Sequence, residues 1–196
     1  LLDQWKINKS DFKILLPGRL TRWKGQELFI EALSMLVEVH SKNNFHAIIL
    51  GSDQGRNVYS KKLLLLVERY RLAKKITFIE NCKEMPIAYK LSDIVVSSSI
   101  EPEAFGRVAV EAQAMEKVII ASNIGGSKET VLNGKSGLLY NFNDSKDLAK
   151  AINKAMEMSK NTLDLMGAEG RKNVEKKFNV DQMCQTTFTE YMKLLK

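Results

Sequence analysis

The chain has 196 residues, of which 44% are hydrophobic, which suits one large domain with a normal buried core rather than two small domains. No apolar run approaches the ~20 residues needed to span a bilayer, and no signal peptide is visible. Cys82 and Cys184 are too few for a disulfide framework or a metal site, and His40 and His46 are too isolated for a zinc centre. We therefore expect a reducing compartment, the cytoplasm.

The formal net charge of +7 is uneven along the chain, because the first 90 residues hold 16 basic and 9 acidic side chains. One basic cluster comprises Lys61, Lys62, Arg69, Arg71, Lys74 and Lys75. A solvated face is the simpler interpretation of this cluster. The alternative is an anionic surface, which would allow peripheral contact with the inner face of a membrane. We expect no nucleic acid partner.

Short apolar segments rich in β-branched residues alternate with stretches of helical periodicity. The expected strands are 13–16, 45–50, 76–79, 94–97, 118–121 and 137–140. The expected helices are 25–40, 59–71, 85–91, 107–115, 127–132, 146–158, 163–176 and 181–195. Because the strands are short, mostly apolar on both faces and separated by helices, they predict a parallel sheet covered on both sides. The fold class is a Rossmann-like three-layer α/β domain with about six strands.

We expect residues 1–196 to form a single domain with a core at about 13–140. The helices of 145–196 would pack on the sheet or reach another domain. Ligands of such sheets bind at the carboxyl ends of the strands. Gly18, Gly51 and the segments 79–82, 97–106 and 123–126 all follow strands, so the candidate chemistry lies along one edge.

The first expected strand runs into the loop P-G-R-L-T-R-W-K-G, in which Arg19 and Lys24 precede a helix that opens at about Gly25. A guanidinium grips two phosphate oxygens at once, and an ammonium adds a compact second charge. Two such cations beside a helix N-terminus suit a diphosphate. The alternative is a solvated turn with ordinary surface charges, and this segment alone favours neither.

The segment S-S-S-I-E-P-E-A-F-G-R-V-A-V-E, residues 97–111, leaves a strand, turns through Pro102 and enters a helix around Gly106. Glu103 lies just ahead of that helix and Glu111 about two turns inside it. Backbone N–H groups at a helix start suit a phosphate, and carboxylates suit hydroxyl groups. A nucleotide-sugar presents both. The alternative is an ordinary helix-start acid and a solvated helix acid, although the apolar neighbours of Glu111 favour a cleft.

The remaining motifs carry less chemistry. Residues 123–126, N-I-G-G, are better explained as a tight turn than as a ligand loop. No G-x-G-x-x-G follows the first strand and no G-x-x-x-x-G-K-[ST] occurs, which disfavours a dinucleotide site and a P-loop. No nucleophile has an adjacent base.

Taken in order, G-R-L-x-x-x-K-G (18–25), E-x-F-G-x-x-x-x-E (103–111), N-I-G-G-x-x-E (123–129) and N-G-x-x-G-L-L (133–139) resemble one family. They are similar to the C-terminal half of retaining glycosyltransferases of the GT-B architecture, family 4 or group 1 type. That group includes sucrose synthase, glycogen synthase and bacterial cell-surface glycosyltransferases. The resemblance covers about residues 13–140.

The resemblance implies residue roles. Arg19 and Lys24 would bind the donor diphosphate, and Glu103 would hydrogen-bond the donor sugar; these three form the expected catalytic set. Glu111 would bind both ribose hydroxyls. Removal of Glu111 should therefore weaken the binding of a bare nucleotide, whereas removal of Glu103, which would contact only the sugar, should leave that binding unchanged. The other expected donor-binding residues are Gly18, Phe105, Gly106, Arg107 and Val108, with Ile79, Asn81 and Cys82 at the base pocket. The resemblance implies a nucleoside-diphosphate sugar as substrate, with no metal and no cofactor.

Two positions depart from the family pattern. Met115-Glu116-Lys117 replaces a turn that usually holds glycine and proline, which is a surface difference. Ala104 stands where the family has glycine in Glu-Gly-Phe-Gly, and its methyl group would narrow the sugar pocket slightly.

The resemblance implies transfer of a sugar to a glycan or lipid acceptor, in cell-surface polysaccharide or glycolipid biosynthesis. The N-terminal domain that supplies the acceptor site in such enzymes is absent from this chain, so we expect the chain alone to be inactive in transfer. The alternative function is a non-catalytic module that binds a nucleotide or a phosphoglycan. A sugar epimerase and a basic adaptor for polyanions are weaker rivals.

Overall fold

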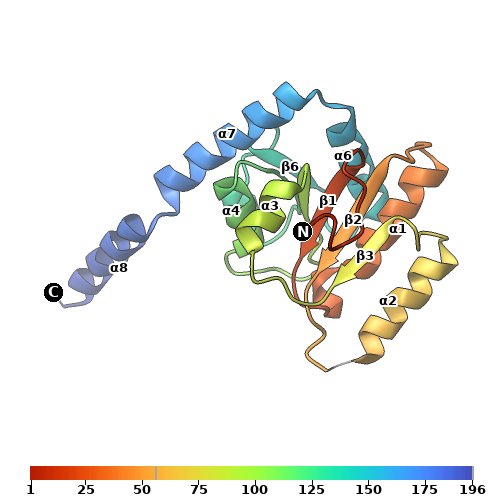
Figure 1. Cartoon of the computed structure of the whole chain (residues 1–196). Coiled ribbons are helices and arrows are strands. Elements are labelled where there is room, and N and C mark those ends of the chain that lie inside the picture. The colour runs from red at the N-terminus through yellow and green to blue at the C-terminus, as the bar shows by residue number, and fades with distance from the viewer. Residues whose placement is uncertain (56, 196) are drawn as a thin grey trace.

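The computed structural model describes residues 1–55 and 57–195, and in it six parallel strands form one sheet in the order β3-β2-β1-β4-β5-β6 (Figure 1). The strands are β1 (Phe12–Pro17), β2 (Phe45–Leu50), β3 (Ile76–Ile79), β4 (Ile94–Ser97), β5 (Val118–Ser122) and β6 (Gly137–Tyr140). The predicted Rossmann-like fold class is confirmed. The chain runs outward from β1 through β2 to β3 and then returns to the other side of β1, where β4 pairs with it. The strand order therefore reverses at β1.

Helices alternate with the strands and then close the chain. They are η1 (Arg22–Lys24), α1 (Gln26–Glu38), α2 (Asn57–Arg69), α3 (Met85–Leu91), α4 (Arg107–Ala114), α5 (Ser127–Thr130), α6 (Ser145–Glu157), α7 (Lys160–Lys177) and α8 (Val180–Leu194). The short 3₁₀ turn η1 was not expected from the sequence. Helix α2 ends two residues earlier than predicted, and Arg71 just beyond it has a left-handed backbone with φ 56°.

The core has two apolar layers, one on each face of the sheet. Alternation along β1 sends Ile14 and Leu16 into the layer under α1, α2 and α6, and Leu15 into the layer under α3 and α4. Nearly every residue of β1, β2, β4 and β5 is buried, whereas three of the four residues of β3 are partly exposed. This is why the strand sequences read as continuous apolar runs instead of alternating ones.

The last helix differs from the other α-helices, because none of its residues is buried. Figure 1 shows α7 running away from the sheet and α8 lying at the far end, with the C-terminus. Helix α7 packs against α4, whereas Met183, Phe188 and Tyr191 of α8 are exposed. Lys196, the end of the expected helical region, lies outside the described residues. Among the residues that the structure describes, no helix has the length and apolar character that crossing a bilayer requires.

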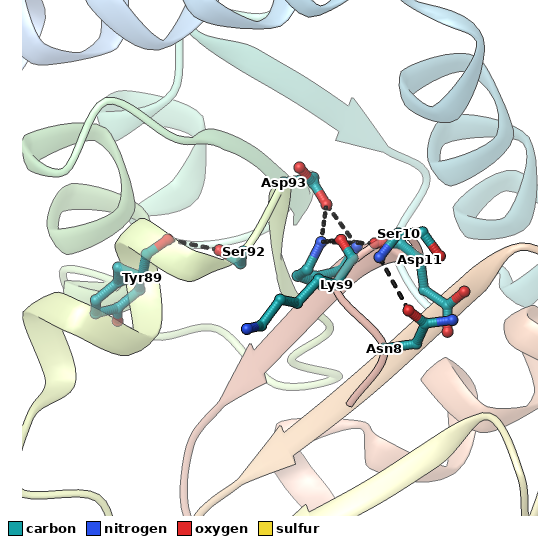
Figure 2. Close-up of polar contacts among 8 residues, drawn as sticks. Asn8, Lys9, Ser10, Asp11, Tyr89, Ser92 and Asp93 are labelled. Carbon is teal, nitrogen blue, oxygen red and sulfur yellow. Dashed lines mark hydrogen bonds and ion pairs between the residues drawn. The ribbon is translucent and has the colours of Figure 1, made fainter. Parts of the chain in front are cut away.

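A buried lysine fixes the amino end of the sheet. Lys13 Nζ donates to the carbonyls of Lys9 (3.0 Å) and Asp11 (2.7 Å), and Asp93 Oδ2 accepts from the Lys13 backbone N–H at 2.6 Å and lies 3.6 Å from Nζ. Figure 2 shows Asp93 beside the segment that holds Lys9 and Asp11. The segment before β1 is thereby held against the turn before β4.

We expect Asp93→Ala to lower the free energy of unfolding by about 1–3 kcal/mol, because it leaves a mostly buried ammonium without its carboxylate. Urea denaturation measures the change. The control is Asp3→Ala, whose pair with Lys9 is exposed on both sides and is worth less than about 1 kcal/mol. Equal losses in the two variants would contradict a structural role for Asp93.

Candidate functional site

A cleft of about 580 Å³ lies at the carboxyl edge of the sheet, over the point where β1 and β4 are neighbours. Open α/β sheets bind ligands at such a reversal of strand order. Its lining brings together eleven of the twelve predicted site residues: Gly18, Arg19, Lys24, Asn81, Cys82, Glu103, Phe105, Gly106, Arg107, Val108 and Glu111. Ile79 does not line the cleft, because as the last residue of β3 it packs against the apolar layer that includes Leu50.

Hydrogen bonds join the two loops that meet in the cleft. The Ser98 hydroxyl, just after β4, donates to the carbonyls of Lys24 (2.9 Å) and Gly25 (3.1 Å), and the Ile100 N–H donates to the Trp23 carbonyl at 2.8 Å. Gly25 has φ 69°, and a Cβ there would lie 1.9 Å from the Ser98 carbonyl oxygen. Only glycine allows this approach, so the close contact between the loops explains the Gly25 of the first motif.

An indole ring lies against both cations of the first loop. The Lys24 Nζ is 4.4 Å from the centroid of Trp23 and the Arg19 Cζ is 5.9 Å from it, both within cation–π range. The Gln26 side chain also donates to the Arg19 carbonyl at 2.8 Å. Trp23 was not among the predicted site residues, although its position between two cations in the sequence could have signalled this contact.

Lys24 and Glu103 meet directly. Nζ of Lys24 lies 2.8 Å from Oε1 of Glu103, and their side chains are only 14% and 17% exposed. The Ser99 hydroxyl donates to the same carboxylate oxygen. The sequence predicted that these two side chains would bind different parts of a ligand. It did not predict that they would pair with each other, since 79 residues separate them.

Glu111 has a partner of its own. The Tyr89 hydroxyl, from α3, donates to Glu111 Oε2 at 2.7 Å, while Glu111 itself is exposed to the cleft. Tyr89 is only 2% exposed, and its burial together with the carboxylate raises its pKa well above the ordinary value. Tyr89 is therefore a hydrogen-bond donor at neutral pH that holds one oxygen of Glu111. Sequence reasoning placed Tyr89 only as a residue of a short helix.

The start of α4 faces the cleft without a capping side chain. Gly106 is its N-cap with φ 76°, no side chain accepts from its first turn, and both Arg107 and Val108 line the cleft. Uncapped amides at a helix N-terminus favour an anion. At the outer end, Phe105 meets Phe178 edge to face, with 5.6 Å between ring centroids.

The Gly125-Gly126 turn supports this loop from behind. The Gly126 N–H donates to the Glu103 carbonyl at 2.8 Å, and a Cβ on Gly126 would lie 2.6 Å from the Phe105 carbonyl oxygen. Neither glycine is among the residues that line the cleft. This agrees with the tight-turn interpretation of the N-I-G-G motif.

The family model described as "Glycosyl transferases group 1" matches residues 2–173. Among curated proteins, the capsular polysaccharide biosynthesis glycosyltransferase CapM of Staphylococcus aureus is 28% identical over 192 residues. That alignment covers 97% of this chain and 48% of CapM. The chain thus spans about half the length, or less, of the curated relatives it matches.

Solved structures agree with the family model. A glycosyltransferase from Rickettsia africae ESF-5 has a TM-score of 0.91 and 31% identity, over 100% of this chain and 51% of its own. Anabaena Alr3699/HepE in complex with UDP and glucose has a TM-score of 0.85 and 28% identity, over 94% of this chain and 49% of its own.

One solved structure is itself a single domain. The C-terminal domain of the group 1 family protein LpcC from Francisella tularensis has a TM-score of 0.77 and 27% identity, and the match covers 91% of this chain and 92% of that domain. The architecture described above is therefore that of the C-terminal half of GT-B glycosyltransferases, and the chain belongs to the group 1 glycosyltransferase family.

Proposed function

We propose that this chain binds the donor of a retaining glycosyltransferase that moves a sugar from a nucleoside-diphosphate sugar to a glycan or lipid acceptor. One observation carries the proposal: two cations and an uncapped helix start share a cleft with two carboxylates. The structure of HepE with UDP and glucose supports a uridine nucleotide as the first donor to test. The similarity to CapM, a capsular polysaccharide biosynthesis glycosyltransferase, supports a role in cell-surface polysaccharide synthesis. Glycolipid synthesis is the other route that the family resemblance implies.

Each part of the donor has a matching group in the cleft. The diphosphate would lie between Arg19, Lys24 and the first amides of α4, where cations and helix N–H groups favour an anion. Glu111 would accept hydrogen bonds from the ribose hydroxyls while Tyr89 holds its other oxygen. The base would lie toward Asn81 and Cys82, and the donor sugar would lie beside Glu103.

The chemistry follows from charge on the leaving group. When the bond between the anomeric carbon and the phosphate oxygen breaks, negative charge develops on the departing nucleoside diphosphate. Arg19, Lys24 and the amides of α4 would stabilise that charge, and such stabilisation is commonly the largest contribution of an active site. The acceptor oxygen would attack on the same face and pass its proton to the leaving phosphate, so no protein base is required.

The rest of the enzyme is also part of the proposal. The acceptor would bind in an N-terminal domain, and the matched glycosyltransferase structures are about twice as long as the region that this chain covers. Peripheral contact with an anionic membrane stays a prediction; Lys61, Lys62 and Arg69 are exposed on α2. We expect no metal in the reaction, and within residues 1–55 and 57–195 no three potential His, Cys, Asp or Glu ligands gather.

A non-catalytic module that binds a nucleotide or a phosphoglycan remains the alternative function. Such a module would bind its ligand in the same cleft, but it would transfer no sugar to an acceptor. Transfer by the longer protein, measured with and without Glu103→Gln, separates the two functions.

The diphosphate assignment predicts that Arg19→Ala and Lys24→Ala each weaken nucleoside diphosphate binding by roughly 1.5–3 kcal/mol, because each removes a charge-assisted hydrogen bond. Calorimetry with UDP, GDP and ADP measures the loss and identifies the base. The control is Arg22→Ala, which removes a charge of the same loop whose side chain lines a different groove. Unchanged affinity in both cleft variants would refute the assignment.

The ribose assignment predicts that Tyr89→Phe weakens UDP binding by about 1 kcal/mol, since the variant loses only the hydroxyl that holds Glu111. If Tyr89 acts through Glu111, the Tyr89→Phe substitution should weaken the binding of 2′,3′-dideoxy-UDP much less than the binding of UDP. Tyr191→Phe is the control, because Tyr191 is exposed on α8 and lies outside the cleft lining. Equal losses for both nucleotides would mean that Tyr89 supports the fold rather than the ribose site.

The domain assignment predicts that residues 1–196 alone transfer no sugar and at most hydrolyse a donor slowly, because the acceptor site lies in another domain. Product analysis with UDP-glucose and a mixture of glycan and lipid acceptors checks this. Efficient transfer by the chain alone would show that it already holds an acceptor site.

A further inference from the structure

The ion pair between Lys24 and Glu103 is built into the fold. Both side chains are more than four-fifths buried, and their nitrogen and oxygen atoms lie 2.8 Å apart. The Ser99 hydroxyl donates to the paired carboxylate oxygen, and Ser99 is itself held, because its carbonyl accepts from the Ser122 hydroxyl at 2.9 Å. Trp23 covers the ammonium on another side. This arrangement holds the carboxylate against the lysine with contacts made by the chain alone.

The pair joins a group suited to phosphate with a group suited to hydroxyls. A bare nucleoside diphosphate needs the Lys24 ammonium, which Glu103 already engages. The ligand also brings negative charge close to a mostly buried carboxylate, and like charges at short range repel strongly where water is scarce. Binding of the bare diphosphate therefore works against Glu103.

A donor that still carries its sugar changes this balance. The sugar hydroxyl groups donate hydrogen bonds to Glu103. These bonds replace part of the interaction with Lys24 that the carboxylate loses when the diphosphate binds the ammonium. A carboxylate that gains such donors is stabilised in its charged form, and the ammonium is then available to the diphosphate.

We propose that Glu103 is a specificity-determining residue that makes the cleft prefer the sugar-bearing donor over the bare nucleoside diphosphate, because its pair with Lys24 competes with the diphosphate unless sugar hydroxyls occupy it. The inference rests on the proposed donor site. It also implies that loss of the sugar on transfer restores the ion pair and promotes release of the spent nucleotide.

This competition predicts the opposite of one expectation from the sequence. The sequence predicts that removal of Glu103 spares a bare nucleotide, whereas competition for Lys24 predicts that its removal strengthens nucleotide binding. This change of sign is what the experiment measures.

Calorimetry of residues 1–196 with UDP and with UDP-glucose compares the wild type with Glu103→Gln, which keeps the shape and removes the charge. We expect UDP to bind about threefold to tenfold more tightly and UDP-glucose to bind about tenfold more weakly. The matched control is Glu101→Gln, an exposed carboxylate two residues earlier that lies outside the cleft lining and should change neither affinity more than about twofold.

Ser99→Ala gives an independent measure, because it keeps the charge and removes the hydroxyl that holds Glu103. It should lower the preference for UDP-glucose over UDP in the same direction, by a smaller factor. Thermal unfolding of each variant verifies that it is folded before the titration.

Two outcomes separate this inference from the proposed function. If UDP binding falls in Arg19→Ala but does not rise in Glu103→Gln relative to Glu101→Gln, the donor site stands and the competition is refuted. If the wild-type chain binds none of UDP, GDP or ADP, the proposed function fails and this inference fails with it.

Discussion

The parallel pairing of β1 with β4 determines where the groups of the cleft lie. Leu15 pairs with Val95 in the parallel register, so the two strands end side by side and the loops that follow them begin at the same edge of the sheet. One loop carries the cations and the other carries Glu103. Hydrogen bonds from Ser98 and Ile100 then fix the separation of the loops. Without this neighbour relation, residues 79 positions apart would not form one site.

Much of this arrangement could be predicted from the sequence. Apolar runs located all six strands to within a residue or two, because buried parallel strands need apolar side chains on both faces. The order of strands and helices, with the rule that ligands bind at carboxyl ends, identified the edge that holds the cleft. Residue chemistry after β1 and β4 then singled out Arg19, Lys24, Glu103 and Glu111.

What the sequence could not supply is the contact between side chains of different elements. The pairs of Lys24 with Glu103 and of Tyr89 with Glu111 depend on strand order and on rotamers, and no local pattern encodes either. Ile79 shows a limit of that rule, because a residue at the right strand end can pack against an apolar layer instead of lining the cleft. Helix ends such as that of α2 depend on single backbone angles, which periodicity does not resolve.

Helix α8 differs from the sheet in what stabilises it. It has 15 residues, begins at an Asn179 cap that accepts from the Gln182 N–H, and buries none of its side chains. A helix of that length without tertiary packing is close to the limit of stability in water. We therefore expect its amide hydrogens to exchange with solvent through local fraying, and those of the buried strand β1 to exchange much more slowly. The cooperatively folded core thus ends near Phe178. The helix that follows it depends on its own backbone hydrogen bonds and its Asn179 cap rather than on tertiary packing.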